Sequence, residues 1–569
     1  MRRNKKHNRN NSLEFQKKFG IIVESRVAKM EGAMLQNIEC DTPMPPTGEL
    51  QKSATAQQAV VATAFPDATA AALDILATGG NAVDAAVAAA WALSVCEPSG
   101  SGLGGQTNLM VHLASGKTIY LDGHSHAPAA ISPRTVKRRQ QMTGYRACTI
   151  PSTVVVLDRA LSRFGTFSLE AVMQPAVRLA KEGFVVTRLQ HQQARWRLSQ
   201  LGREDRTIRI LRRHRWHTGE RLAQPRLAKT LTRIARTGCA DFYHGHLAND
   251  IVDDMERNGG LITARDLAST RLPVVRKTVS IDYRGYKIVT TPPPGGGLQL
   301  LLALKLLERL LDSTAQPASS DWYEAIALAT HAAFVEREKF PIHPDDFSPS
   351  LQQWALSDAR ADELALPLYL HRRLDCATTS AEGPGETTHL CVADDQGNIV
   401  SLTQSIQSLF GARVANARLG FLYNNYLTTC PRYPHPYQLG SSCLPRSNAA
   451  PTLVMKNGKV VVALGAAGSR RITSSILQII SRVIDLKMPL SDAIAAPRIH
   501  ALLNGQVWIE RPAATAGMMA RLEKVFARTI VRSTNSFTMA GAQAVAMSNE
   551  NHLKHAAADP RRDGAAGGY

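Results

Sequence analysis

The chain has 569 residues, of which 44% are hydrophobic and 20% charged, and its 67 Lys and Arg against 47 Asp and Glu give a formal charge of +20. These proportions exclude wholesale disorder and a fibrous protein, and the length allows one large core or several. The charge is concentrated in two segments, with a net +7 over residues 1–30 and +11 over residues 186–236. Because the remainder is nearly neutral, the whole protein is not a basic nucleic-acid coat.

Residues 1–53 are predicted to form a basic disordered tail and a Pro-containing linker. The tail starts with positive charge but lacks the apolar segment and small-residue cleavage site of an export signal. The longest apolar stretch near the front, residues 85–96, is too short to span a bilayer. The 8 cysteines show no C-x-x-C spacing and make no disulfide framework in so long a chain. We expect a cytoplasmic protein with no membrane span, metal or cofactor.

Order is expected to begin near residue 54, with a short strand over residues 59–64 followed by two helices. Gly79 and Gly80 end the first helix, and Asn81 caps the second with Asp84 in its first turn. Further elements follow from apolar periodicity. They are strands at 108–115, 117–123 and 286–291, helices at 172–184, 227–235, 247–262 and 298–311, then strands at 388–395, 398–406, 420–425, 451–469 and 506–510 around a helix at 472–486. Strand and helix blocks are segregated, which predicts a layered α+β fold.

The segment Gly100–Gly105 matches G-x-G-x-x-G, the dinucleotide-binding fingerprint. That fingerprint requires a strand before the loop and a helix after it, so that the pyrophosphate meets a helix N-terminus. Here a helix precedes and a strand follows. The pattern therefore favours a tight turn that brings the backbone close to another segment over a nucleotide site.

The basic segment 186–236 contains Trp196 and Trp216 among its arginines, as nucleic-acid patches do. The arginines between 206 and 215 would spread around a helix instead of forming one stripe. We interpret the segment as a solvated helical surface, with an anion-attracting rim and a nucleic-acid patch as alternatives. The histidine pairs at 214/217 and 244/246 lack neighbours with metal-ligand spacing and are interpreted as solvated.

The segment around Thr387 is the candidate catalytic site. A three-residue turn at 395–397, with Gly397 in the left-handed position, would place Thr387 directly opposite Ser405. A threonine hydroxyl needs a base, and its own N-terminal amine, with a pKa of about 7.7–8, can serve. Thr387 gains that amine only if its Oγ attacks the Glu386 carbonyl and the bond between the two residues is cut. From spacing alone, this hypothesis competes with an ordinary strand that begins Thr-Thr.

Blocks in consistent order over residues 57–569 resemble the gamma-glutamyltranspeptidase (glutathione hydrolase) family of N-terminal-nucleophile hydrolases. The blocks are GGNAVDAAVAAAWALSVCEPSGSGLGG, QPAVRLAKEGF, FYHGHLANDI, GGLITARDL, YRGYKIVTTPPPGGG, ETTHLCVADDQGNIVSLTQSI, GFLYNN, PTLVMKNGK, ALGAAGSRRI and DPRRDGAAGGY. The resemblance implies an αββα sandwich made from one precursor. That precursor would cut itself into a large subunit, 54–386, and a small subunit, 387–569, which remain together as a heterodimer.

The resemblance also implies roles for individual residues. Thr387 would attack a γ-glutamyl amide, and Ser405 occupies the position of the hydroxyl that hydrogen-bonds this nucleophile. Gly468 and Ser469 stand where two glycines supply oxyanion N–H groups, and a serine at 469 keeps that N–H. Ser447 matches the first of two serines that contact the substrate carboxylate.

The chain departs from the family pattern where the family binds the substrate's α-amino-acid group. His124 replaces the expected carboxylate-binding arginine, and Thr429 replaces the aspartate that binds the α-ammonium. Tyr426 stands where Gln or Glu is usual, Gln407 replaces an asparagine and Asn448 the second serine. Losing charge-assisted contacts on both groups would suit a substrate without a free zwitterionic head.

The sequence therefore predicts a self-cleaving transferase or hydrolase that acts on a small γ-glutamyl substrate such as glutathione, with no nucleic-acid partner. The main alternative is a family amidase or acylase acting on a small amidated acid, a β-lactam side chain or polyglutamate. A third possibility is an uncleaved, non-enzymatic relative. Arg413 or Arg446, if either reached the site, could replace the missing arginine.

Overall fold

The computed structural model describes residues 51–198, 216–270, 273–311, 319–370, 374, 385–548 and 552–569. The predicted tail up to residue 50 and the arginines from 206 to 215 lie outside these ranges. The described chain starts at residue 51, slightly before the predicted linker boundary at 53. Gln51 accepts a backbone hydrogen bond from Ala566 (2.8 Å), and Lys52 Nζ donates to the carbonyls of Arg562 and Gly564.

Two seven-stranded antiparallel sheets form the centre of the molecule. The first has the order β1 (Ser53–Ala56), β18 (Lys554–Ala558), β17 (Gly541–Met547), β13 (Lys459–Ala467), β12 (Thr452–Lys456), β9 (Tyr286–Thr290) and β8 (Val279–Tyr283). The second has the order β19 (Ala565–Gly568), β2 (Val60–Thr63), β10 (Gly385–Ala393), β11 (Ile399–Ser408), β3 (Gln106–His112), β4 (Thr118–Asp122) and β7 (Val274–Arg276). Each sheet mixes strands from before and after Thr387.

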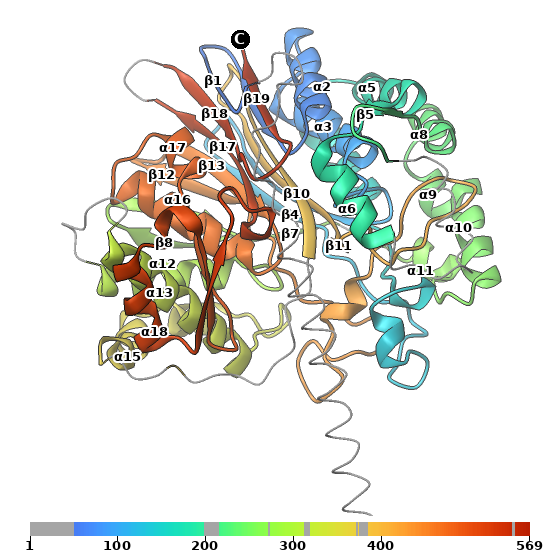
Figure 1. Cartoon of the computed structure of the whole chain (residues 1–569). Coiled ribbons are helices and arrows are strands. Elements are labelled where there is room, and N and C mark those ends of the chain that lie inside the picture. Colours follow the sequence, from blue (N-terminus) through green and yellow to red (C-terminus); the bar gives the residue numbers. More distant parts are fainter. Residues whose placement is uncertain are drawn as a thin grey trace, which may run out of the picture.

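Helices cover the outer face of each sheet, so the molecule has four layers (Figure 1). One outer layer contains α2 (Pro66–Ala77), α3 (Ala82–Cys96), α4 (Thr153–Phe164), α5 (Leu169–Glu182), α6 (Arg188–Leu198), α8 (Pro225–Thr237), α9 (Asp241–His244), α10 (His246–Arg257) and α11 (Ala264–Ala268). The other contains α12 (Gly297–Leu310), α13 (Ser320–Lys339), α14 (Pro349–Ala355), α15 (Asp358–Tyr369), α16 (Arg471–Ile484), α17 (Leu490–Ala495) and α18 (Ala516–Val525), with the small sheet β14 (Ile499–Ala501), β15 (Gln506–Glu510) and β16 (Arg528–Arg532). The predicted αββα sandwich is confirmed.

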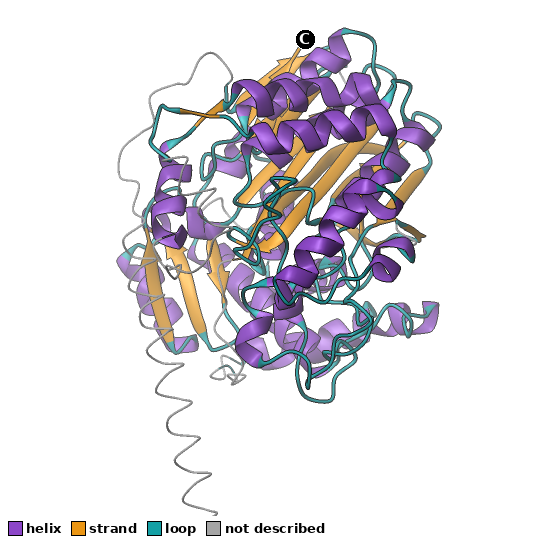
Figure 2. Cartoon of the chain, turned by 90° about the vertical axis from the view of Figure 1, so that its right-hand side faces the viewer, coloured by secondary structure: helices purple, strands orange, loops and turns teal. Residues whose placement is uncertain are grey.

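Three apolar clusters correspond to the three interfaces between these layers. Alternation along a strand divides its side chains between two of them: on β10, Leu390 and Val392 face the helices, whereas Cys391 and Ala393 face the other sheet. The helix α3 has every residue buried, which explains why its sequence is mostly small and apolar. Figure 2 shows the helical layer lying across the strands of the sheet behind it.

Most predicted elements are present, and local signals explain their ends. The Asn81 side chain accepts the N–H groups of Val83 and Asp84, and Asp84 accepts the Asn81 N–H, which completes a capping box at the start of α3. The predicted strand at 420–425 is wrong. Leu422 and Tyr423 make only isolated bridges to loop residues, because the partners available to them there, Ala415 and Gly104, belong to no strand.

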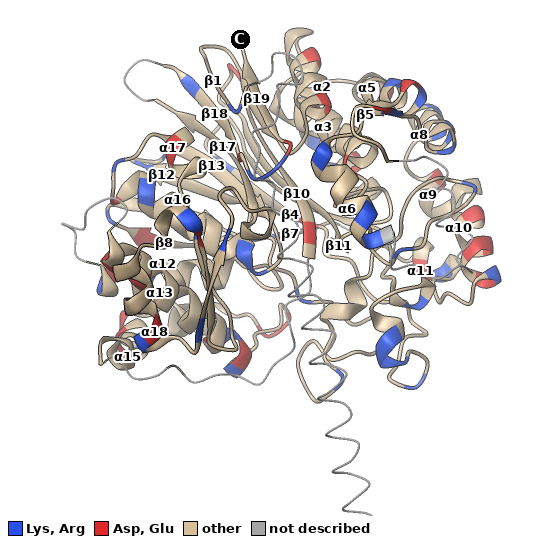
Figure 3. Cartoon of the chain, in the orientation of Figure 1, with Lys and Arg blue, Asp and Glu red and all other residues tan. Residues whose placement is uncertain are grey.

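The aromatic residues of the basic segment belong to the core. Trp216 is 6% exposed and meets Phe184 and Phe410 edge to face, and Trp196 packs against the same cluster. Trp216 is therefore not available to stack on a base, and Trp196 is only partly exposed. Lys and Arg are interspersed with Asp and Glu over the outer helices around α10 (Figure 3).

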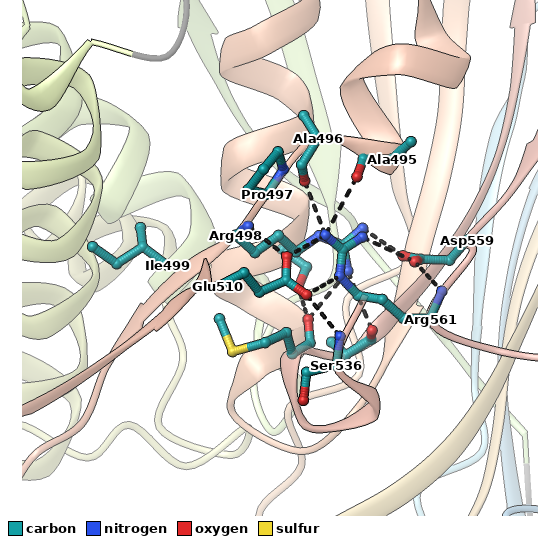
Figure 4. Close-up of polar contacts among 12 residues, drawn as sticks. Ala495, Ala496, Pro497, Arg498, Ile499, Glu510, Ser536, Asp559 and Arg561 are labelled. Carbon is teal, nitrogen blue, oxygen red and sulfur yellow. Dashed lines mark hydrogen bonds and ion pairs between the residues drawn. The ribbon is translucent and has the colours of Figure 1, made fainter. Parts of the chain in front are cut away.

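A buried charged network anchors the C-terminal segment (Figure 4). Asp559 pairs with Arg498 and Arg561, and Arg561 Nε donates to Glu510 at 2.9 Å. Burial alone would raise the pKa of Asp559, but the two guanidinium groups hold it below its ordinary value. Arg498 also donates to the carbonyl of Ala540, so the network fixes the loop that lies against Gly468.

Among the helices of the described residues, none has both the length and the apolar character that a membrane-spanning helix needs.

Candidate active site

The hairpin β10–β11 has the predicted register, with one irregularity at Thr387. Pairs from Ala393–Ile399 to Thr388–Gln404 follow the register set by the turn at 395–397, where Gly397 has a φ of +92°. The register then shifts, so that Glu386 pairs with Gln407. Two residues of β11 consequently face the single residue Thr387, which is a β-bulge.

The bulge places three oxygen atoms in a chain of hydrogen bonds. Thr387 Oγ1 donates to Ser405 Oγ over 3.2 Å, and Ser405 Oγ donates to the carbonyl oxygen of Glu386 over 2.9 Å. The N–H of Gln407, whose φ is +80°, also donates to Ser405 Oγ (2.9 Å). The hydroxyl of Thr387 is thereby connected, through one serine, to the carbonyl of its own preceding peptide bond.

The Gly100–Gly105 loop holds this bulge from behind. The Gly100 carbonyl accepts the N–H of Ile406 (3.1 Å), and a Cβ on Gly100 would lie 3.1 Å from Glu386 Cγ. A Cβ on Gly105 would lie 2.3 Å from the Ser405 carbonyl oxygen. The glycines thus allow close backbone approach to the Glu386–Thr387 segment, as the tight-turn interpretation expects.

Gly468 and Ser469 lie between β13 and α16, beside the same peptide bond. A Cβ on Gly385 would be 2.6 Å from Ser469 Cβ, and Ser469 and Thr387 both line one cavity. Gly468 has a φ of +132° and Ser469 a φ of +59°. The two residues precede α16, so their N–H groups are near the positive end of its dipole, which favours a developing oxyanion.

Thr387 and Ser405 line the cavity together with Gln407 and Tyr426. Burial raises the pKa of the Tyr426 hydroxyl, while hydrogen bonds to Ser405 and Gln106 act in the opposite direction. Thr429 is not among the lining residues; its hydroxyl donates to the carbonyl of Tyr426 (3.0 Å). The segment that replaces the family's ammonium-binding group therefore presents a phenol to the cavity.

A second wall of the cavity is formed by residues 447–449. Ser447 Oγ accepts the N–H of Ala449 (3.1 Å), and Arg337 donates to Asn448 Oδ1 (2.6 Å) and to the carbonyl of Ser447 (2.7 Å). Arg337 was not predicted from the sequence. It lies on α13, more than a hundred positions from its partners, and an arginine in a helix gave no local signal of a site.

His124 is 2% exposed and lies behind the cavity wall. Its Nδ1 is 2.5 Å from Asp122 Oδ1, and its Nε2 is 3.3 Å from Asn108 Nδ2, Asn108 being a lining residue. Asn108 Oδ1 accepts from Gly123 and Tyr120, so Nδ2 must be the donor and His124 Nε2 the acceptor. His124 thus acts on the cavity through Asn108 and does not line it directly.

The structure therefore brings most of the predicted site residues together around one cavity. His124 and Thr429 are not among its lining residues, but each contacts a residue that is. The lining residues Gln106 and Asn108 were missed, because alternate positions on an ordinary strand, β3, carry no local sequence signal. Neither Arg413 nor Arg446 is among the lining residues, and Arg446 instead pairs with Glu338 at 3.1 Å.

Comparisons with known proteins agree with this arrangement. The family model described as gamma-glutamyltranspeptidase matches residues 68–569. The glutathione hydrolase proenzyme of Escherichia coli (strain K12) is 32% identical over 84% of this chain and 88% of its own length. The acylase ACY 1 proenzyme of Pseudomonas sp. (strain SE83) is 34% identical over 79% of this chain and 83% of its own. The crystal structure of cephalosporin acylase from Bacillus halodurans superposes with a TM-score of 0.81 at 26% identity, covering 94% of this chain and 99% of that one.

Proposed function

Because the chain belongs to the gamma-glutamyltranspeptidase family of enzymes, we propose that it cuts itself before Thr387 and then uses Thr387 to hydrolyse or transfer a γ-glutamyl group. The observation that carries the proposal is the hydrogen-bonded chain from Thr387 Oγ1 through Ser405 Oγ to the Glu386 carbonyl oxygen. The substrate is a small γ-glutamyl amide of the glutathione type. The cytoplasmic location expected from the sequence stays a prediction.

Self-cleavage begins when Thr387 Oγ1 attacks the carbonyl carbon of Glu386 and gives up its proton. Ser405 Oγ takes up that proton as it passes its own proton along its hydrogen bond to the carbonyl oxygen, which is gaining negative charge. The C–N bond then breaks, the proton reaches the nitrogen of Thr387, and an ester links Glu386 to Thr387 Oγ1. Water hydrolyses the ester, which leaves a carboxylate on Glu386 and a free α-amine on Thr387.

Turnover repeats this chemistry on a substrate in the cavity. The α-amine of Thr387 takes the proton from its own Oγ1, which attacks the substrate amide carbon. The N–H groups of Gly468 and Ser469 stabilise the oxyanion, and the leaving amine takes up the proton. Water or an acceptor amine then attacks the acyl-threonine ester and restores the hydroxyl.

The test is a denaturing gel together with a chromogenic assay. Purified wild type should give two bands that correspond to residues 1–386 and 387–569, and Thr387→Ala should remain one chain. Wild type should release p-nitroaniline from γ-glutamyl-p-nitroanilide, and Thr387→Ala should not. A single wild-type band would overturn self-cleavage, and a cleaved protein inactive on this anilide would overturn the γ-glutamyl substrate.

A second candidate, an acylase of the same family with a different amide substrate, is favoured by one feature of the cavity. Among the described residues that line it, none is Asp or Glu, and Tyr426 and Thr429 occupy the segment where the α-ammonium would bind. An ammonium group would therefore be desolvated without a carboxylate partner there. An acyl group without that ammonium avoids this cost.

A further inference from the structure

Arg337 connects three segments next to the cavity. Its Nη1 donates to Asn448 Oδ1 (2.6 Å), and its Nη2 donates to the carbonyls of Ser447 (2.7 Å) and Pro294 (3.3 Å). The Ser447 N–H in turn donates to the Pro294 carbonyl (3.1 Å). The end of α13 therefore fixes the 447–449 wall against the PPPGGG loop.

The contact with Arg337 determines which end of the Asn448 amide is available to a substrate. A guanidinium group only donates hydrogen bonds, so the Asn448 atom that faces it must be the oxygen. The NH2 group is then the end left for a molecule in the cavity that Asn448 lines. Ser447 also lines the cavity, and its Oγ accepts the N–H of Ala449, which leaves its hydroxyl proton free to donate. The wall thus offers donors to an anionic group.

The surroundings of this wall are positively charged. Arg446 and Arg470 both pair with Glu338, the residue next to Arg337, at 3.1 and 3.2 Å. Three guanidinium groups therefore lie around a single carboxylate. Burial and the neighbouring arginines lower the pKa of Arg337 to about 10, which still leaves it charged at neutral pH. A negative group at the wall would experience an attractive field from these guanidinium groups.

We propose that Arg337 is a specificity-determining positioning residue: by fixing Asn448 and Ser447 as donors, it selects amide substrates whose acyl group ends in a free carboxylate, whether or not an α-ammonium is present. This inference rests on the proposed amide chemistry of Thr387. In this arrangement the neutral donors Asn448 and Ser447, held in place by Arg337, take over the role of the arginine that the family pattern has and this chain lacks. The predicted substrate class is a dicarboxylic acid monoamide.

Four anilides that share a butyryl backbone and differ in the substituents on its last carbon separate the two head groups. The γ-glutamyl compound carries a carboxylate and an ammonium, glutaryl only the carboxylate, 4-aminobutyryl only the ammonium, and butyryl neither. For wild type we expect kcat/KM on glutaryl to equal or exceed that on γ-glutamyl, and values at least about tenfold lower on the last two. Equal turnover of glutaryl and butyryl p-nitroanilide would overturn the inference.

Variants then test Arg337 itself. Arg337→Gln should raise KM for the two carboxylate substrates about tenfold with little change in kcat, leave butyryl unchanged and leave self-cleavage intact. The KM of Arg337→Lys should lie between those of wild type and Arg337→Gln, because lysine keeps the positive charge but cannot donate the paired hydrogen bonds of a guanidinium group. Arg309→Gln, on the neighbouring α12 with its partners Asp358 and Asp362, is the matched control and should match wild type.

Asn448→Asp tests whether residue 448 must present a hydrogen-bond donor to the cavity. The aspartate keeps the size of asparagine and pairs with Arg337, but it presents oxygen to the cavity, so glutaryl turnover should fall and 4-aminobutyryl turnover should rise. An unchanged order of substrates, or an equal loss on all four in Arg337→Gln, would overturn the inference and leave the amide chemistry standing. No product from any anilide with wild type would overturn both.

Discussion

The directions of the N–H groups of Gly468 and Ser469 depend on unusual backbone angles. The two positions differ in the side chains that they tolerate. Gly468 has a φ of +132°, and a Cβ there would lie 3.0 Å from Ala540 Cα, so Gly468→Ala should displace its N–H. We expect kcat on γ-glutamyl-p-nitroanilide to fall at least about tenfold. Ser469→Gly relieves a φ of +59° and keeps the N–H, so its kcat should stay within about twofold. Equal losses in both variants would contradict this assignment.

The ionisation of Asp122 makes the stability of the fold depend on pH in acid. Burial alone would raise its pKa, but His124 and Arg276 outweigh burial and lower the pKa to about 2. A carboxylate whose folded pKa lies below its unfolded value of about 3.9 stabilises the fold above that value, by about 2 kcal/mol here, and loses this contribution as the pH falls from about 4 to 2.

The corresponding measurement is the free energy of urea unfolding of Thr387→Ala with and without Asp122→Asn, a background in which one uncut chain unfolds. The double variant should be less stable at pH 7, and the difference should narrow below pH 4. A difference that stays constant from pH 7 to pH 3 would exclude Asp122 as its source. Because His124 and Arg276 remain in both proteins, the comparison isolates the carboxylate.

At the scale of elements, the loop before β3 and the bulge of β11 fit only because the loop is made of glycine. A Cβ on Gly105 would lie 2.3 Å from the Ser405 carbonyl oxygen, and this contact could be relieved only by a shift of the backbone. Gly105→Ala should therefore displace Ser405 and slow self-cleavage at least about tenfold, followed on a gel during expression. Gly517→Ala in α18, where a Cβ meets open space, is the matched control and should cleave normally. Wild-type cleavage by Gly105→Ala would show that the contact does not position Ser405.

The sequence predicted those elements whose signals are local. The turn at 395–397 was sufficient to predict the register that brings Thr387 to Ser405, because loop length fixes the pairing of a hairpin. The bulge itself could not be predicted, since it depends on how the Gly100–Gly105 loop meets β11. For the same reason, the strand expected at 420–425 proved to be a loop: its apolar residues pack into the core without a strand beside them.

The site residues divide in the same way. Thr387, Ser405, Gly468 and Ser469 follow from motif positions near the ends of strands, and they line or adjoin the cavity. Arg337 could not be predicted, because its partners are reached only when α13 packs beside the PPPGGG loop. His124 was expected in direct contact with substrate, yet its ring is committed to Asp122 and Asn108. Residues that act through tertiary contacts leave no spacing in the chain.

At the scale of the whole molecule, the bond before Thr387 divides the chain but neither sheet. In one sheet β10 pairs with β2 and β11 with β3; in the other β12 pairs with β9 and β18 with β1. Every one of these pairs joins a strand from before the bond to a strand from after it. Separating the two fragments would expose all four of these inter-strand ladders and the apolar layer between the sheets.

We therefore expect the cleaved protein to elute from size-exclusion chromatography as one species that contains both fragments, and to separate only in denaturant. Residues 387–569 expressed alone should remain unfolded, because β10 and β12 would lack the neighbours on one side that bury them. Co-expression with residues 1–386 should restore a folded complex, with circular dichroism as the measurement. A small fragment that folds alone would mean that the two sheets are stable without their shared pairs, so that self-cleavage could release a separate domain instead of exposing a nucleophile within an intact sandwich.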